Sequence, residues 1–174
     1  AGAITVEIAQ SGGGLPGPIS LAETPPASGV FSEDLLLGTG AGRRTVSHGD
    51  RVTISYTDLD DGVSGSPVKV TAQIDVDCVA PAVAGVRILE VVGDQAVIAW
   101  ETNEPSTGQI TAGTASAQGG ITATIEVPGT SHSVVLNGLK RDTPYFFKIA
   151  AADAARNTTV DDAGGACRRI TPVS

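Results

Sequence analysis

The sequence predicts an all-β protein made of two stacked-sheet units in tandem, and three observations support this prediction. Apolar side chains recur at every second position in several short segments, which is the period of a β-strand. The apolar residues are mostly Val, Ile and Ala, and Thr is frequent, a composition typical of strands. Turn-forming Gly and Pro, 22 and 10 of the 174 residues, separate the segments. We therefore expect almost no helix.

Three segments of the first half show the alternation. Residues 4–8 (ITVEI) and 51–58 (RVTISYTD) place their apolar side chains on one face. Residues 68–77 (VKVTAQIDVD) are the clearest case, with apolar residues at the even positions and polar residues at the odd positions. Antiparallel strands with one face in water have this pattern. Runs such as SGGGLPGP, ETPPASG and DLDDGVSGSP end the strands, because glycine reaches positive φ and proline lacks an N–H donor.

A domain boundary is predicted in residues 75–83 (DVDCVAPAV), where a strand ends at a cysteine and a proline-containing connector follows. The predicted domains are residues 1–79 and 80–174. The candidate strands after the connector are VRILEVV, QAVIAW, GQITAG, ITATIEV, SHSVVL, PYFFKIAA and CRRITPV. Their number and spacing favour an immunoglobulin-like sandwich.

Trp100, the single tryptophan of the chain, is predicted to lie in the core. It shares a face with Ala96 and Ile98, and the polar segment NEPST after it is predicted to connect two strands. The alternative is an exposed indole that serves as a ligand platform.

The second domain resembles a fibronectin type III domain over nearly all of residues 80–174. The segments that carry the resemblance are APAVAGVRI, AVIAWETNEPSTGQI and HSVVLNGLKRDTPYFFKIAAAD. The resemblance implies that Trp100 packs between two sheets and that Tyr145 is a tyrosine corner, with a buried ring and a hydroxyl bonded to nearby backbone. The other positions of the family pattern hold Leu136, Leu139, Thr143, Phe147, Ile149 and Ala151. TNEPSTGQITAG is also similar to a bacterial subtype of secreted enzymes and surface proteins, although Ala112 and Gly113 replace its usual Tyr-Gly pair.

The first domain resembles the immunoglobulin-like modules of very large bacterial extracellular proteins. The segments LAETPPASGVFSEDLLLG and HGDRVTISYTDLDDG carry this resemblance. Its turn and core positions are occupied by Glu23, Gly29, Phe31, Asp50, Tyr56 and Asp58. Taken with the alternation, the two resemblances predict an all-β chain of two immunoglobulin-like β-sandwiches in tandem.

The net charge of −8 argues against two classes of partner. It would repel a phosphate backbone and gain little at an anionic membrane surface, so no nucleic-acid partner is expected. No apolar run approaches the roughly 18 residues that a membrane span needs. We therefore expect no membrane span.

Cys78 and Cys167 are predicted to form a disulfide. A metal site would need more soft ligands close together, whereas closing a long loop stabilises the folded chain. A disulfide implies an oxidising compartment, so a secreted or cell-surface location in a bacterium is expected. The chain contains no Met, and a start at AGAITVEI is typical of a mature product or a fragment from which a leader has been removed.

No catalytic residue is predicted. A Ser, Cys or Thr nucleophile needs a base within reach, and the two histidines, His48 and His132, lie in or beside turns, where a surface position is expected. No G-x-S-x-G motif leads into a helix, and SGGGLPG lacks the Lys-Ser/Thr ending of a P-loop. The few aromatic residues offer little surface for stacking sugars. We expect that the protein is not an enzyme.

Calcium is the one cofactor that the sequence suggests. Roughly six to eight hard oxygens surround a calcium ion, and Asp58, Asp60 and Asp61 in the loop TDLDDG offer several. A second candidate loop contains Asp153, Asn157, Asp161 and Asp162. Local Asx turns favour the same residues, and the distant Glu of an EF-hand loop is missing. A calcium site and a purely local role both remain open.

The sequence thus predicts a non-catalytic structural, adhesion or spacer module of a secreted or cell-surface bacterial protein. Its partners would be other domains of the same polypeptide or proteins at the cell surface. One alternative is a self-assembling subunit of an extracellular filament or surface layer, in which an edge strand such as AGAITVEIA pairs with a neighbouring subunit. The other is a calcium- or carbohydrate-binding accessory domain of a secreted hydrolase.

Overall fold

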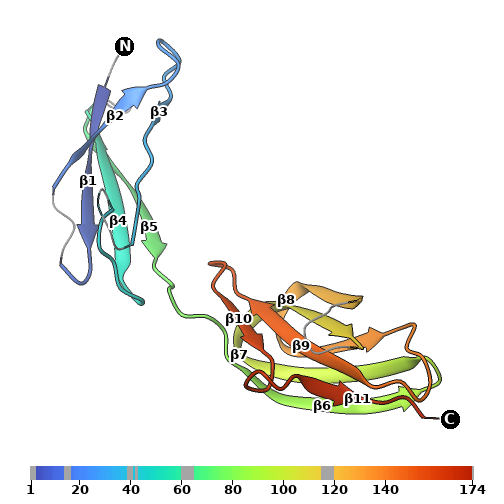
Figure 1. The fold of residues 1–174 in the computed structure, drawn as a ribbon. Helices are drawn as coiled ribbons and strands as arrows, with labels where there is room; N and C mark the ends of the chain where they lie inside the picture. The colour runs from blue at the N-terminus through green and yellow to red at the C-terminus, as the bar shows by residue number, and fades with distance from the viewer. Residues whose placement is uncertain are drawn as a thin grey trace. The chain divides into compact units, whose positions relative to one another are not determined.

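The computed structural model describes residues 3–13, 17–38, 41, 43–59, 65–114 and 120–173, and these residues form eleven β-strands and no helix (Figure 1). The prediction of an all-β chain is confirmed. Accordingly, no helix that could span a membrane is found among them. The chain divides into two compact units, Ala1–Cys78 (unit 1) and Val79–Ser174 (unit 2), which we describe separately. The predicted boundary after residue 79 lies next to this division.

Unit 1 consists of one antiparallel sheet with the strand order β3-β2-β1-β4-β5. The strands are β1 (Ala3–Gln10), β2 (Ile19–Glu23), β3 (Phe31–Ser32), β4 (Arg51–Asp58) and β5 (Val68–Asp75). β1 changes its partner along its length, because its first half pairs with β2 and its second half with β4. Among the described residues, each half of β1 thus pairs with a single neighbouring strand, and the pairing of this strand with another subunit stays a prediction. Its inward side chains, Val6 and Ile8, are buried between these neighbours.

The core of unit 1 is small. Ile8, Val52 and Val76 form its buried cluster. Partly buried side chains pack round them from β2, from β4 and from the segment between β3 and β4, namely Ile19, Leu35, Leu37, Val46 and Ile54. That segment therefore covers β1 and β4, whereas all eight residues of β5 are exposed.

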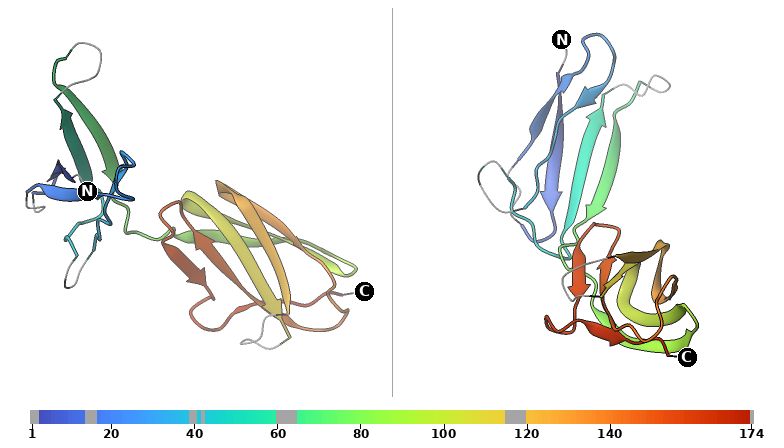
Figure 2. Two further views of the ribbon diagram at one scale, coloured as in Figure 1. Left: turned by 90° about the horizontal axis from the view of Figure 1, so that it is seen from above. Right: turned by 45° about the vertical axis from the view of Figure 1, so that its right-hand side comes forward.

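Unit 2 is built round one long strand. Its strands are β6 (Val83–Val92), β7 (Gln95–Gly113), β8 (Ile121–Leu136), β9 (Tyr145–Ala152), β10 (Thr158–Asp161) and β11 (Arg168–Ile170). The first half of β7 pairs with β6 and with the end of β8, and its second half pairs with the start of β8 and with β9. β10 and β11 both pair with β9. β7 and β8 bend along their length, as Figure 2 shows, so the sheet curls.

The sequence predicts that the NEPST segment connects two separate strands, and this prediction is wrong. β7 continues through it, and only the pairing with β8 shifts register, between Glu101 and Ser106. The same applies to β8, which joins the two predicted strands ITATIEV and SHSVVL into one. A continuous strand is compatible with the proline here, because a register shift leaves local backbone donors without a ladder partner.

The curl brings the inward side chains of both halves of β7 into one core. Buried members of this core are Ala96, Ile98, Trp100, Ile110, Ala112, Val134, Leu136, Leu139, Tyr145, Phe147, Ile149 and Ile170. Gly108 gives the room that the largest of them needs: a Cβ added there would lie 2.5 Å from Cζ2 of Trp100. Trp100 therefore packs directly on the backbone of the second half of its own strand.

Candidate functional site

The first predicted calcium loop lies mostly beyond the described residues. Asp58 is the last residue of β4 and is half-buried. Asp60 and Asp61 lie outside the described residues, so a calcium site formed with them stays a prediction.

The second predicted calcium loop uses its carboxylates for local contacts. Asp153 accepts hydrogen bonds from the backbone N–H and from Nδ2 of Asn157, both at 2.8 Å. Asp161 Oδ2 lies 2.9 Å from Nε of Arg168. Asp162 Oδ1 accepts a backbone N–H of the following turn at 2.8 Å. Asx-type turns and one ion pair thus account for these side chains without a cation.

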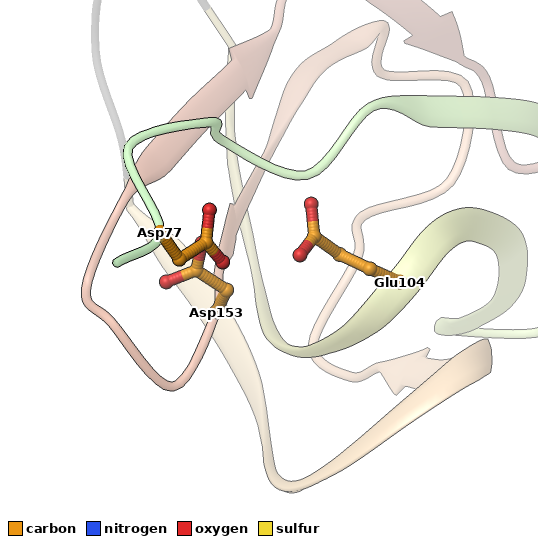
Figure 3. A group of neighbouring side chains, drawn as sticks. All are labelled: Asp77, Glu104 and Asp153. Carbon is orange, nitrogen blue, oxygen red and sulfur yellow. The ribbon is translucent and has the colours of Figure 1, made fainter. Parts of the chain in front are cut away.

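Figure 3 shows three carboxylates, of which Glu104 and Asp153 belong to unit 2 and Asp77 to unit 1. Within unit 2, an oxygen of Glu104 lies within 4.8 Å of an oxygen of Asp153. Within unit 1, Asp77 Oδ1 lies 3.0 Å from Nδ1 of the exposed His48. Asp153 is already bonded to Asn157, so its place beside Glu104 follows from the turn that it closes.

A buried polar cluster joins β7 to β8 in unit 2. Thr102 Oγ1 lies 3.1 Å and Ser106 Oγ 3.4 Å from Nε2 of His132, and the two hydroxyl oxygens are 3.2 Å apart. The imidazole stacks on the indole of Trp100, with 5.1 Å between the ring centroids and 16° between the planes. The cluster lies where the pairing of β7 with β8 shifts register after Glu101.

The cluster contains the residue types of a nucleophile and its base, but they are enclosed in the core. Ser106 is 0% exposed and His132 is 3% exposed. A hydroxyl nucleophile has to touch the atom that it attacks, so Ser106 could meet a substrate only if the sheet opened. The arrangement is suited to holding two strands together.

Burial also affects the protonation of the His132 imidazole. It lowers the pKa of His132 below its ordinary value of 6.5, and a backbone contact with Gly129 opposes this effect more weakly. His132 Nδ1 and Trp100 Nε1 are buried and have no hydrogen-bond partner among the described residues. A charge added to the imidazole would therefore be poorly solvated, and the neutral form is favoured.

The surface position predicted for His132 is wrong. The signal that could have placed it is the alternation in SHSVVL, which puts His132 on the same face as Val134 and Leu136. His132 is also directly opposite Trp100 in the β7–β8 register. Ser106 and Thr102 carry no such signal, because small polar residues give no periodicity that distinguishes a buried from an exposed position.

The structure places Trp100 and Tyr145 in the core of unit 2. Trp100 is 0% exposed, and the Tyr145 ring is buried as well. The hydroxyl oxygen of Tyr145 accepts a hydrogen bond from the backbone N–H of Lys140 at 3.1 Å. This bond connects the start of β9 to the loop before it, and a tyrosine corner stays a prediction of the resemblance.

No disulfide joins Cys78 and Cys167 in the structure. Cys78 is the exposed last residue of unit 1, and Cys167 is half-buried beside β11 in unit 2. The predicted disulfide would therefore join the two units and would not close a loop within one of them. It is not formed in the structure and stays a prediction.

A shallow hollow of about 290 Å³ lies on unit 2, lined by Val86, Ile88, Phe147, Arg168 and Arg169. Phe147 is only 1% exposed, so its ring forms the floor and offers no face for stacking. Arg168 is engaged with Asp161. The hollow thus lacks the exposed aromatic platform that a small-molecule site usually combines with polar groups.

Compared with models of known protein families and with curated proteins, the chain matches none of either.

Proposed function

We propose that the chain is a non-catalytic structural, adhesion or spacer module of a secreted or cell-surface bacterial protein, built from two immunoglobulin-like β-sandwiches. The observation that carries the proposal is the use of the large aromatic side chains in unit 2. Trp100, Tyr145 and Phe147 are all buried in one core, whereas carbohydrate and peptide sites expose such rings to their ligands. The large aromatic side chains of unit 2 thus stabilise its core and are not exposed to a ligand.

The strand pairing of unit 2 supports the sandwich. β7 pairs with β6 along its first half, with β9 along its second half and with β8 along both, and the residues that both halves turn inward meet in a single core. Two stacked layers of antiparallel strands, formed in this way, are the basis of an immunoglobulin-like domain. The bond from the Lys140 N–H to the Tyr145 hydroxyl adds the tyrosine corner that the fibronectin type III resemblance implies.

Two turns support the resemblance of unit 1. Glu23 Oε1 accepts the backbone N–H of Gly29 at 2.9 Å, and Gly29 has a φ of 72°, a value that favours glycine. Asp50 Oδ2 accepts the N–H of Ser47 at 2.7 Å, immediately before β4. The pattern residues Glu23, Gly29 and Asp50 therefore have local structural roles, as expected of a module in which they stabilise turns.

The location is tested on the producing bacterium. Antibodies raised against residues 1–174 should label intact cells or detect the protein in the medium, and brief protease treatment of intact cells should remove the cell-bound signal. Labelling that appears only after lysis would contradict the proposal.

The role is tested by exchange. Replacing residues 1–174 with an unrelated pair of β-sandwiches of the same length should leave the display and activity of the flanking domains unchanged if the module is a spacer. Loss of attachment to a surface, with display intact, would identify adhesion. Loss of an enzymatic activity in the exchanged protein would sink the non-catalytic assignment.

A further inference from the structure

β5 is an edge strand that is exposed along its whole length. It pairs with β4 on one side, over all eight residues from Val68 to Asp75, and it ends the strand order of unit 1 on the other side. Long edge strands offer their free N–H and C=O groups to another chain, and natural proteins usually cover, shorten or charge them. β5 is neither short nor covered by any described residue.

The register shows which backbone groups point to the open edge. The Val76 N–H donates to the Asp50 carbonyl at 2.8 Å, so the even-numbered residues of this strand make the hydrogen bonds to β4. Hydrogen-bonding direction alternates along an antiparallel strand. The N–H and C=O groups of Lys69, Thr71, Gln73 and Asp75 therefore point away from β4.

The even side chains of β5 form an uncovered apolar strip on the core side of the sheet. Val70 pairs with Tyr56, Ala72 with Ile54, and Ile74 with the fully buried Val52. Yet Val68, Val70 and Ile74 are 43%, 58% and 48% exposed. The strip thus continues the core face of β4 beyond the region that the rest of unit 1 covers.

The sequence of this strand is complementary to itself when it is run antiparallel. With Ala72 opposite Ala72 of a second chain, Val70 faces Ile74, Val68 faces Val76, and Thr71 faces Gln73 on the other side of the sheet. Lys69 then faces Asp75, once on each side of the two-fold axis. Opposite charges directly across a strand pair stabilise it, and so do apolar pairs.

We propose that β5 pairs antiparallel with β5 of a second copy of the chain, in the register that places Lys69 opposite Asp75. This register pairs odd-numbered residues with odd-numbered residues. It is compatible with the backbone geometry, because only the odd-numbered residues have N–H and C=O groups at the open edge. The interface is isologous, so it closes with two chains and builds no fibre. It goes beyond the proposed function and does not depend on it.

Charge disfavours two other registers of the same parity. A shift that places Lys69 opposite Lys69, or Asp75 opposite Asp75, brings like charges together, which destabilises a strand pair. A lone lysine on an edge strand would be a device against pairing. Here an aspartate occupies the mirror-image position, and Asp75 already accepts Arg51 Nε at 2.6 Å, so its carboxylate would lie between two cations.

The test uses the full chain, with reducing agent present so that the thiols cannot cross-link it. Sedimentation equilibrium of the wild type should show a reversible dimer whose fraction rises with concentration. Lys69→Asp alone and Asp75→Lys alone should each raise the dimer dissociation constant about tenfold or more, because each replaces two attractive pairs by two repulsive ones. An equimolar mixture of the two variants should recover association, since every Lys then faces an Asp.

Two controls separate pairing from general charge effects. Lys148→Asp makes the same charge change at an exposed position of β9 and should leave the dimer unchanged. Thr71→Pro removes an N–H at the open edge and should abolish the dimer, with circular dichroism showing retained strand structure. A wild type that stays monomeric into the millimolar range, a dimer insensitive to Lys69→Asp or Thr71→Pro, or a mixture that fails to associate would each overturn the proposal.

Discussion

The two units contain strands with the same alternation of apolar and polar residues but bury them to very different extents. Among the described residues, the core of unit 2 has twelve buried members and includes Trp100, Tyr145 and Phe147, whereas that of unit 1 has three. The alternation of β5 in unit 1 is as regular as that of β9 in unit 2. Yet β9 buries four of its eight side chains and β5 buries none.

The difference teaches that alternation specifies a strand and its faces but does not specify burial. Burial needs a second layer, and unit 2 obtains one because β7 is long enough to curl and to pair with β6 along its first half and with β9 along its second. Unit 1 covers only β1 and β4, with the chain between β3 and β4. Unit 2 should therefore be the more stable unit, and its stability should depend on a few large side chains.

The largest effect is expected from Trp100→Ala. Removing a fully buried indole should lower the free energy of unfolding of unit 2 by about 3–5 kcal/mol, through lost burial and the remaining cavity. Calorimetry should show the transition of unit 2 moved to lower temperature and that of unit 1 unchanged. Val127→Ala, at a side chain that is 77% exposed, is the control and should leave both transitions in place. A Trp100→Ala protein as stable as the wild type would mean that the core does not depend on the indole.

A smaller loss is expected from Gly108→Ala, which tests how tightly the two halves of β7 pack. The new Cβ would lie 2.5 Å from Cζ2 of Trp100, so the ring or the strand has to move, at a cost of about 1–3 kcal/mol. Gly120→Ala is the matched control, because its Cβ would meet only the Ala112 carbonyl at 3.9 Å. Urea unfolding followed by circular dichroism measures both. Equal losses of unfolding free energy in the two variants would show that the close contact of Trp100 with Gly108 does not make this position sensitive to a Cβ.

Tyr145→Phe should cost about 1 kcal/mol, since it removes one hydrogen bond, to the Lys140 N–H, and keeps the ring. Tyr56→Phe in unit 1 is the counterpart, and no stability loss is expected there. The measurement is urea unfolding of each variant. If Tyr145→Phe were as stable as the wild type, the Tyr145 hydroxyl would contribute nothing to the stability of unit 2.

Much of this could be predicted from the sequence where the period of two extends over a whole strand. β4 and β9 lie within a residue of the segments RVTISYTD and PYFFKIAA, and Trp100 lies on the inward face that Ala96 and Ile98 mark. These features are local, because each strand carries its own pattern.

What could not be predicted depends on contacts between segments far apart in the sequence. The merging of four predicted strands into β7 and β8 reflects pairing across the NEPST segment, where composition alone indicates a turn. The exposure of β5 depends on which segment covers the sheet. The burial of His132 depends on Trp100, its partner across the β7–β8 pair.

The smallest expected effect is a pH dependence of the stability of unit 2 that arises from His132. Its pKa is lowered by burial in the folded state, so between about 6.5 and that lower value the unfolded chain binds more protons than the folded chain. The stability of unit 2 is thus fully present above pH 6.5 and falls as the pH drops toward the folded-state pKa. Calorimetry at pH 7.5 and pH 5.5, still above the range where most carboxylates titrate, should show the transition of unit 2 at a lower temperature in the more acidic buffer.

His132→Gln should flatten this dependence, because the side chain then has no proton to bind, although the variant is less stable at both pH values. His48→Gln removes the other histidine, which is exposed and paired with Asp77 in unit 1, and should leave the slope of unit 2 as it is in the wild type. If the stability of unit 2 depended on pH to the same extent in His132→Gln, a group other than His132 would bind the proton. The core of unit 2 would then tolerate a charged imidazole between Trp100 and the two hydroxyls, and the cluster would have to be more hydrated than its burial indicates.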